Sequence, residues 1–416
     1  MPDGADRGRA GITRRGVLLG GAGLAAIDPI RAMAESGFDW KRYKGQHIEV
    51  SLQKSPRADL LQQHQKEFED LTGISVGAEQ IPEQQHRQKF VIEFSSGHPS
   101  FDVVNLAPHV QKKLVGKTKW LEDLRPYIQD SNATSPDFDF SDFSKPSLDY
   151  ATQPDGRLDM LMWNLDYQAL YWNKGLFAQK GVAYPKSLAE IADVAKALHD
   201  PKRNIAGFVA RGLKNANAPV WTELLLGWNV NSIDPDLTMH TDGAEAIAAA
   251  QLYQTLLKDY GPPGVSGFNW YEAQTSFVLG RAAMLLEVTG FALPFENPKT
   301  SRVVGKVGYG VVPPGPKAQI AGLTADALGI AAKSPNKGPA WLYMQWACGK
   351  QMMARQLSGG YGAPPRMSVF KMAEEDRTRR RRGPGSSSWR NRRRWRGPCC
   401  RRSLRSPSSA TSSASR

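Results

Sequence analysis

The sequence has few cysteines, no long apolar run and no metal-binding motif. Only three of its 416 residues are cysteine, and Cys348, Cys399 and Cys400 do not form a framework of paired spacings. No run of 18 or more apolar residues occurs, so the sequence predicts no transmembrane helix. The seven histidines are scattered, without an H-E-x-x-H motif or a Cys/His cluster. We therefore expect neither a metal site nor a cofactor.

Motifs that activate a nucleophile or bind a nucleotide are also missing. The sequence contains no G-x-S-x-G elbow and no Walker loop. Gly308-Tyr309-Gly310 lacks the third glycine of a dinucleotide-binding loop and is followed by Pro313 and Pro314. These absences favour a binding protein over an enzyme. A secreted carbohydrate-active enzyme that uses Asp166 as its catalytic acid remains the alternative.

The positive charge is concentrated at the end of the chain. Residues 377–416 contain fourteen arginines and no acidic residue, which accounts for a charge equal to the net charge of +14. Leu404 is the only aliphatic residue larger than alanine there, so we expect this tail to be disordered. It is either an arm for nucleic acid or anionic lipid, or the product of a reading-frame shift in a GC-rich gene. We favour the frameshift and expect no nucleic-acid partner. Resequencing of the gene decides between the two origins of the tail.

The first 34 residues have the order of a secretory signal. Thr13, Arg14 and Arg15 precede an apolar run over residues 17–26, and Ala32-Met33-Ala34 provides a small-residue cleavage site. The paired arginines are typical of the twin-arginine class. The sequence therefore predicts a periplasmic protein that is exported by this route.

Residues 160–177 place one acid inside an apolar stretch. Asp166 lies between the apolar runs of residues 160–163 and 169–172. A buried carboxylate is costly unless a polar partner meets it, so either the fold or a ligand must satisfy Asp166. We interpret the stretch as a strand that crosses from one lobe to another, with Asp166 at a ligand cleft.

The residues before this stretch alternate between strand and helix patterns. The expected order is strand 47–52, helix 56–72, a strand from 74, helix 84–96 and strand 101–106. This order predicts a parallel α/β sheet, in which ligands bind beyond the carboxyl ends of the strands. The rule points to residues 54–57 and 105–109.

A second α/β unit is expected after the crossing. The predicted helices are 187–199, 241–260, 271–279 and 338–357, the predicted strands are 205–209, 282–288 and 328–332, and 305–316 is a predicted loop. Trp221 and Trp270 lie at loop-to-helix junctions and are candidates to stack on a sugar ring. Trp163 and Trp172 are expected to pack in the core.

Seven segments together resemble the sugar family of extracellular solute-binding proteins of ABC importers. They are FEDLTGISV (68–76), FDVVNLA (101–107), DYQALYWNKGLFAQKGV (166–182), FVLGRAAMLLEVTG (277–290), GYGVVPPGP (308–316), GIAAKSPNKGPAWLYMQW (329–346) and GAPPRMSVF (362–370). The resemblance covers residues 43–370 and stops where the arginine-rich tail begins. It implies a type II periplasmic-binding-protein fold, with two α/β lobes joined by crossover strands.

The resemblance also implies a ligand, a site and a partner. The ligand would be a sugar or polyol, bound as the lobes close and then delivered by a monomer to the inner-membrane permease. The implied site residues are Ser55, Arg57, Asn105, Asp166, Phe291 and Arg366, beside Trp221 and Trp270. The expected lobes are 35–162 with 287–328, and 163–286 with 329–376.

Overall fold

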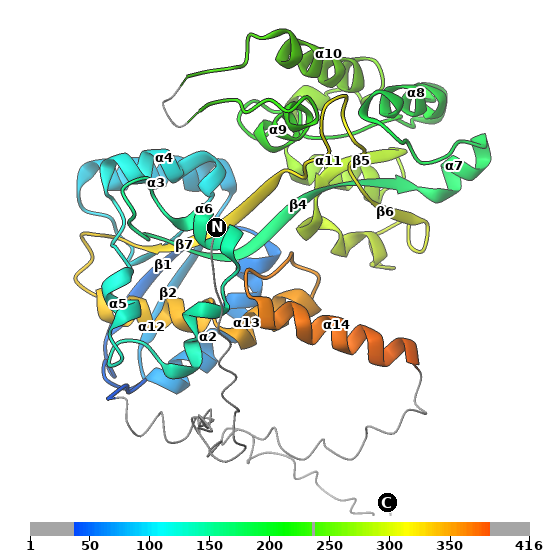
Figure 1. The fold of residues 1–416 in the computed structure, drawn as a ribbon. Coiled ribbons are helices and arrows are strands. Elements are labelled where there is room, and N and C mark those ends of the chain that lie inside the picture. Colours follow the sequence, from blue (N-terminus) through cyan, green and yellow to red (C-terminus); the bar gives the residue numbers. More distant parts are fainter. Residues whose placement is uncertain (1–36, 235–237, 383–416) are drawn as a thin grey trace, which may run out of the picture.

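The computed structural model describes residues 37–234 and 238–382, which form two α/β lobes (Figure 1). The predicted signal at 1–34 and residues 383–416 of the predicted tail lie outside the described residues. The strands are β1 (His47–Gln53), β2 (Ser75–Ile81), β3 (Val103–Leu106), β4 (Leu161–Asn173), β5 (Met284–Val288), β6 (Val307–Val311) and β7 (Leu323–Ile330). The helices are α2 (Pro56–Thr72), α3 (Glu83–Ser96), α4 (Pro108–Thr118), α5 (Arg125–Gln129), α6 (Lys145–Ala151), α7 (Lys174–Lys180), α8 (Leu188–Leu198), α9 (Ala218–Gly227), α10 (Ala244–Lys258), α11 (Trp270–Val278), α12 (Lys337–Ala347), α13 (Lys350–Ser358) and α14 (Met367–Arg382). Short 3-10 turns include η1 (Pro136–Phe138), η2 (Phe140–Asp142), η3 (Pro201–Arg203), η4 (Val265–Gly267), η5 (Thr289–Phe291) and η6 (Leu293–Glu296).

The strand order combines parallel and antiparallel neighbours. It runs β2-β1-β3-β7-β4-β5, and β6 pairs with β4. β1 is parallel to both β2 and β3, as the strand and helix order predicted. β7 returns antiparallel between β3 and β4. The α/β fold with two lobes expected from the sequence is confirmed.

β4 is the strand that both lobes share. Its first half pairs with β7 up to Tyr167, and its second half pairs with β5 from Gln168 onward. Figure 1 shows β4 and β7 running side by side from one lobe to the other. Asp166 lies next to the change of partner, so the crossover strand is confirmed over Leu161–Asn173, whereas residues 174–177 of the predicted stretch begin α7.

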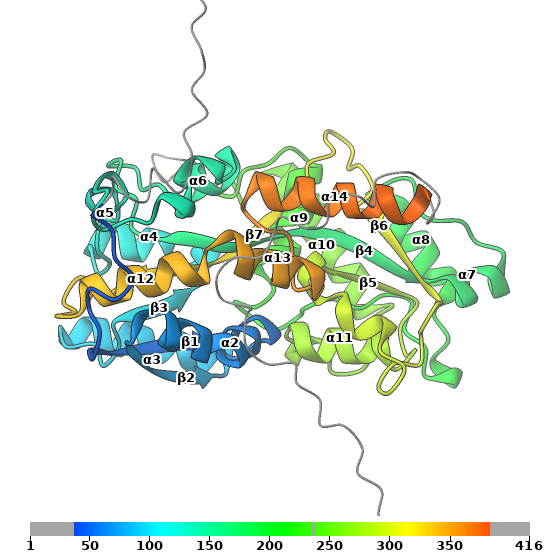
Figure 2. The ribbon, with the colours of Figure 1, turned by 90° about the horizontal axis from the view of Figure 1, so that it is seen from below.

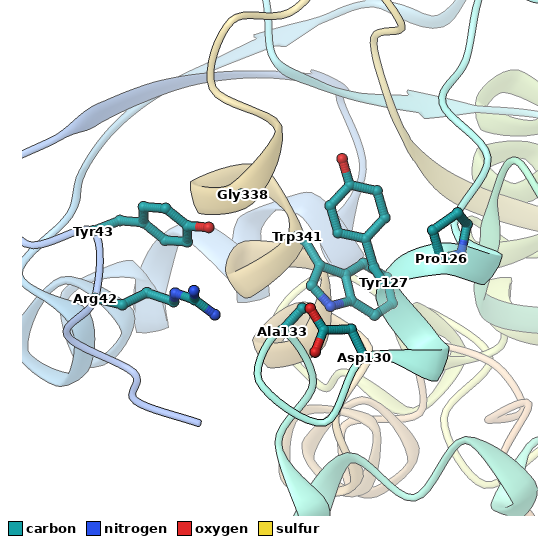
Figure 3. Close-up of a pocket in the computed structure, with 8 residues that line it drawn as sticks. All are labelled: Arg42, Tyr43, Pro126, Tyr127, Asp130, Ala133, Gly338 and Trp341. Atoms are coloured by element: carbon teal, nitrogen blue, oxygen red, sulfur yellow. The ribbon is translucent and has the colours of Figure 1, made fainter. Parts of the chain in front are cut away.

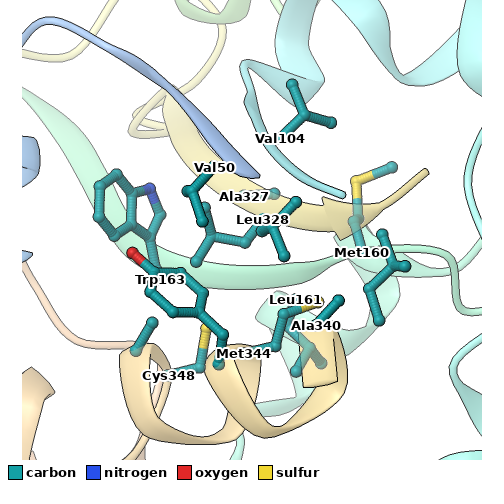
Figure 4. Close-up of a cluster of buried hydrophobic side chains, with 14 of the residues drawn as sticks. Val50, Val104, Met160, Leu161, Trp163, Ala327, Leu328, Ala340, Met344 and Cys348 are labelled. Carbon is teal, nitrogen blue, oxygen red and sulfur yellow. The ribbon is translucent and has the colours of Figure 1, made fainter. Parts of the chain in front are cut away.

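The core of the first lobe joins its sheet to α12 and also includes residues of α3 and α4. Figure 4 shows Trp163 of β4 and Leu328 of β7 above Met344 and Cys348 at the end of α12. Trp163 is fully buried, as predicted for a packing residue. Burial raises the pKa of the Cys348 thiol to about 12, which makes it an inert core residue.

The second lobe has a separate core on each face of its sheet. Leu170 and Leu286 pack on the face covered by α8, α9 and α10. The neighbouring Tyr171 and Leu285 pack on the other face with Phe277 of α11. Side chains of a strand point alternately to the two faces, so β4 and β5 serve both cores.

The late lobe boundaries expected from the sequence are wrong. Phe295 and Val307 belong to a core of the second lobe, whereas Trp341 and Val369 belong to the core of the first. The reason is that β5 turns back antiparallel to β4 and stays in the second lobe. The chain returns to the first lobe through β7, from residue 323 onward.

Several local predictions also differ from the structure. Residues 307–311 form β6 instead of a loop, and the single helix predicted over 338–357 is divided by Gly349 into α12 and α13. Residues 205–209 form only isolated bridges. Figure 2 shows α14 lying beside α13, and this helix extends to Arg382, six residues into the predicted disordered tail. Among the described helices, none combines the length and apolar character needed to cross a membrane.

Candidate functional site

Arg57 lies where the two lobes meet. It is the second residue of α2, which begins where β1 ends and is capped by the Ser55 side chain. Its Nη1 donates to Asp166 Oδ2 at 3.0 Å and to the Tyr361 carbonyl at 3.1 Å. Its Nη2 donates to Asp326 Oδ2 at 2.5 Å. One guanidinium thus ties together α2, both crossover strands and the segment before α14.

Asp166 is enclosed by backbone as well as by charge. Asn164 donates to its Oδ2 at 2.7 Å, and a Cβ atom at Gly290 or Gly362 would lie 2.5 or 2.8 Å from its Oδ1. These glycines let the backbone approach the carboxylate closely. Burial raises the pKa of Asp166, and the charge of Arg57 opposes the rise. Side chains of the protein itself therefore provide hydrogen-bond partners for the buried carboxylate of Asp166.

The second lobe contributes its own buried ion pair. Arg211 donates from Nε and Nη2 to the two carboxylate oxygens of Glu287 at 2.7 and 2.5 Å. The side chains are 7% and 0% exposed. Because both donors point at one carboxylate, the geometry is the bidentate form that is strongest for arginine.

An aromatic pair joins the charged groups. The rings of Trp270 and Phe291 are stacked with centroids 4.5 Å apart and planes at 12°. The guanidinium carbons of Arg57 and Arg211 each lie 5.8 Å from the centre of the Phe291 ring. Phe291 therefore lies within cation–π distance of an arginine from each lobe.

Hydrogen bonds to Glu83 connect the lobes. Glu83 binds Arg87 at 2.5 Å on the first turn of α3. Its Oε2 also accepts from Asn269 Nδ2 at 3.1 Å and from Trp270 Nε1 at 3.2 Å, both at the start of α11. These contacts across the cleft require the lobes to be close together.

His109 is a neutral group near the same charges. Burial, together with the positive charges of Arg87 and Arg211, lowers the pKa of His109 to about 3. Its Nδ1 has no hydrogen-bond partner among the described residues, nor do Arg57 Nε and Arg87 Nε and Nη1. Buried polar atoms are normally satisfied, so these four unpartnered atoms are candidates to bind a ligand.

The described residues also line cavities outside this cluster. One of about 210 Å³ in the first lobe lies between Arg42 and Tyr43 on one side and Tyr127 and Trp341 on the other (Figure 3). Another, of about 730 Å³, lies beside β4 and β6 and is lined by Gln168 and other residues. No group of three or more His, Cys, Asp or Glu residues within 37–234 and 238–382 is placed to hold a metal ion.

Comparison with known proteins decides the family. The family model of bacterial extracellular solute-binding proteins matches residues 54–354. The chain belongs to this family. An erythritol/L-threitol-binding protein of Mycolicibacterium smegmatis is 28% identical over 80% of this chain and 73% of the relative. A probable amino-acid ABC transporter periplasmic-binding protein of Sinorhizobium fredii is 25% identical over 85% and 82%.

Solved structures of solute-binding proteins have the same fold. One from Agrobacterium radiobacter in complex with ribitol superposes with a TM-score of 0.74 over 81% of this chain and 84% of that protein, at 24% identity. A maltose-bound protein of Thermotoga maritima superposes with a TM-score of 0.70. The type II periplasmic-binding-protein fold is thereby confirmed.

Four of the eight predicted site residues come together in this solute-binding protein. Arg57, Asp166, Trp270 and Phe291 form the cluster described above. Ser55 caps α2, with its Oγ accepting from Ala58 N at 3.2 Å, so it positions Arg57.

The other three predicted residues are bound within the fold. Asn105 is 1% exposed, and it accepts from the Gln53 backbone and donates to the Ala327 carbonyl. Trp221 packs against the core of the second lobe. Arg366 is fully buried in the first lobe, where it donates to the carbonyls of Cys348 and Asp139. We therefore leave Asn105 and Arg366 out of the site, whereas the half-buried Trp221 stays a candidate.

Six residues of the cluster were not selected from the sequence. They are Glu83, Arg87, His109, Arg211, Glu287 and Asp326. His109 lies within the stretch 105–109 to which the strand-end rule pointed. Asp326 has the same signal as Asp166, because it is one acid inside an apolar strand. Arg211 carries no signal of this kind, since its partner Glu287 is 76 residues away, and the spacing of Glu83 and Arg87 is that of an ordinary helical ion pair.

Proposed function

We propose that this solute-binding protein binds a sugar or polyol between its lobes and delivers it to the permease of an ABC importer. The observation that carries the proposal is the set of buried, unpartnered polar atoms on Arg57, Arg87 and His109. Arginine nitrogens donate and a neutral histidine Nδ1 accepts, and a hydroxyl group can meet both needs. The erythritol and threitol ligands in the name of one relative agree with this chemistry.

Closure of the lobes is the step that we propose traps the ligand. Glu83 and Trp270 belong to different lobes and are hydrogen-bonded at 3.2 Å. A ligand that binds both lobes shifts the equilibrium toward this closed form, which the permease then recognises. The protein would act as a monomer, with no chemical change of its ligand.

A thermal-shift panel followed by calorimetry tests the ligand class. The panel contains sugars, polyols and amino acids, the last because a second relative is named as a probable amino-acid binder. We expect a sugar or polyol to bind with a Kd of about 1 μM. Selective binding of an amino acid would refute the proposal. Chromatography of the recovered ligand tests the enzyme alternative, which predicts a product.

Export by the twin-arginine route is the second part of the proposal. Arg14 and Arg15 precede the apolar run of the predicted signal. The double change Arg14→Lys and Arg15→Lys keeps the charge and removes the paired arginines. We expect it to abolish recovery of the protein in the periplasmic fraction, with Arg7→Lys as the matched control. Undiminished export of the double variant would refute this route.

A further inference from the structure

We infer that the cleft selects a neutral ligand against its anionic derivatives, such as phosphate esters and aldonic acids, and that Asp326 determines this selection. The inference rests on the proposed function, because it concerns the class of sugar or polyol that the same site accepts.

The carboxylates of the cluster outnumber its guanidinium groups. Arg211 is paired with Glu287 alone, and Arg57 is paired with two acids, Asp166 and Asp326. Arg87 is paired with Glu83. Four carboxylates thus face three cations, and His109 adds no charge at neutral pH. An anionic ligand brought into this buried region would meet an excess of negative charge.

Each arginine of the cluster also has its Nη2 engaged by a carboxylate. Arginine binds phosphate and carboxylate groups most strongly through two parallel N–H donors. The two terminal nitrogens of Arg57 donate to Asp166 and Asp326, and Nε and Nη2 of Arg211 donate to Glu287. A phosphate would have to displace a carboxylate from a buried pair, which leaves that carboxylate without its partner.

The atoms that remain suit hydroxyl groups. The free donors are Nε of Arg57 and Nε and Nη1 of Arg87. The two free donors of Arg87 do not form a parallel pair, because each parallel pair of a guanidinium includes Nη2, and Arg87 Nη2 is bound to Glu83. His109 Nδ1 is an acceptor, because the ring is neutral and its other nitrogen is the one bonded to the Ala325 backbone. A fully ionised phosphate or carboxylate has no proton to donate to that nitrogen, whereas a hydroxyl group has one.

Asp326 is the member of the cluster that creates the excess. Arg57 is already paired with Asp166, so Asp326 adds a second acid to the same cation. The substitution Asp326→Asn keeps the size and one acceptor oxygen and removes one negative charge. It leaves as many carboxylates as guanidinium groups around the ligand.

Calorimetry on the full chain tests the inference. The probes are erythritol, L-threitol and ribitol, each with its own monophosphate and its own aldonic acid. We expect the wild type to bind a neutral polyol about 100-fold more tightly than either derivative. We expect Asp326→Asn to reduce this ratio at least about tenfold, with the exposed Asp149→Asn as the matched control.

The outcomes separate the inference from the proposed function. If a phosphate or aldonic acid binds the wild type as tightly as its parent polyol, the selection is refuted while polyol binding stands. If Asp326→Asn is folded and its ratio is unchanged, Asp326 is not the determinant. Should that variant fail to fold, Glu287→Gln frees Arg211 in the same way and must lower the ratio. If neither neutral nor anionic probes nor other sugars bind, the proposed function and the inference both fail.

Discussion

Trp270 Nε1 donates to Glu83 Oε2 at 3.2 Å across the cleft, so an indole of the second lobe is fixed by a carboxylate of the first. The same indole stacks on Phe291, and the same carboxylate binds Arg87. This relationship links closure of the lobes to the position of two groups in the proposed site. Stability of the closed form and ligand affinity should therefore change together.

The first prediction removes this contact but keeps the ring. Trp270→Phe combined with Asn269→Ala eliminates both donors from the second lobe to Glu83 and leaves an aromatic residue to stack on Phe291. A hydrogen bond to a charged group contributes about 1.5–3 kcal/mol, so we expect the affinity to fall about tenfold or more. Calorimetry measures the affinity, and small-angle scattering with saturating ligand measures whether the lobes close.

Trp228→Phe is the matched control, because it alters a half-buried tryptophan that packs in the second lobe. It should leave both measurements unchanged. If the double variant closes and binds like the wild type, Glu83 does not hold the lobes together.

The second prediction concerns Asp166. Asp166→Asn keeps the shape and removes the charge that pairs with Arg57. Removing the charge of one partner of a buried ion pair destabilises the folded protein strongly. A ligand bound to Asp166 would lose its charged acceptor as well. We expect a 10- to 100-fold loss of affinity, that is about 1.4–3 kcal/mol, with the far-ultraviolet circular dichroism retained. Unchanged affinity in a folded variant would remove Asp166 from the site.

Much of the first lobe could be predicted because its signals are local. The strand and helix alternation before residue 106 fixes parallel pairing, and a lone acid in an apolar stretch located the crossover at Asp166. Trp270 and Phe291 followed from a loop-to-helix junction and a family resemblance. In each case the deciding residues are close together in the sequence.

The parts of the fold and of the site that the sequence did not predict depend on long-range pairing. Residues 307–311 read as a loop because of their glycines and the prolines that follow, yet pairing with β4 makes them a strand. Arg211 and Glu287 are separated by 76 residues, and Arg57 and Asp326 by 269. Sequence spacing carries no information about such pairs, so most of the charged cluster was missed.

The third prediction separates packing from binding at Arg366. Its guanidinium carbon lies 4.1 Å from the centre of the Phe143 ring and 4.8 Å from that of Phe138, and its Nε donates to the Cys348 carbonyl at 2.8 Å. Arg366→Lys retains the charge but loses the planar fork and its stacking. We expect the free energy of unfolding to fall by about 2–4 kcal/mol, measured by urea titration.

The ligand affinity of Arg366→Lys should equal that of the wild type at a temperature where the variant is folded. Arg355→Lys, at a partly exposed ion pair with Glu67, is the control and should change stability by less than about 1 kcal/mol. A stable variant with weakened binding would show instead that Arg366 contacts the ligand, as the family resemblance implied.

The fourth prediction concerns Glu223. This residue is 3% exposed and lies beside the loop that precedes β7. Its carboxylate accepts from the Gly322 backbone N–H at 2.5 Å. Burial raises the pKa of Glu223 from 4.5 to about 7, and the bond from Gly322 opposes the rise. The folded protein thus keeps a proton that the unfolded chain has already lost in the same pH range.

This difference fixes the sign of the pH dependence. Because the pKa is higher in the folded state, the contribution to stability is complete below about pH 4.5 and is lost as the pH rises through about 7. Glu223→Gln cannot ionise and should gain stability relative to the wild type between pH 5 and 8, by up to about 3 kcal/mol. Urea titrations of both proteins at half-unit steps of pH measure the gain. A difference that stays constant across this range would show that Glu223 does not titrate there.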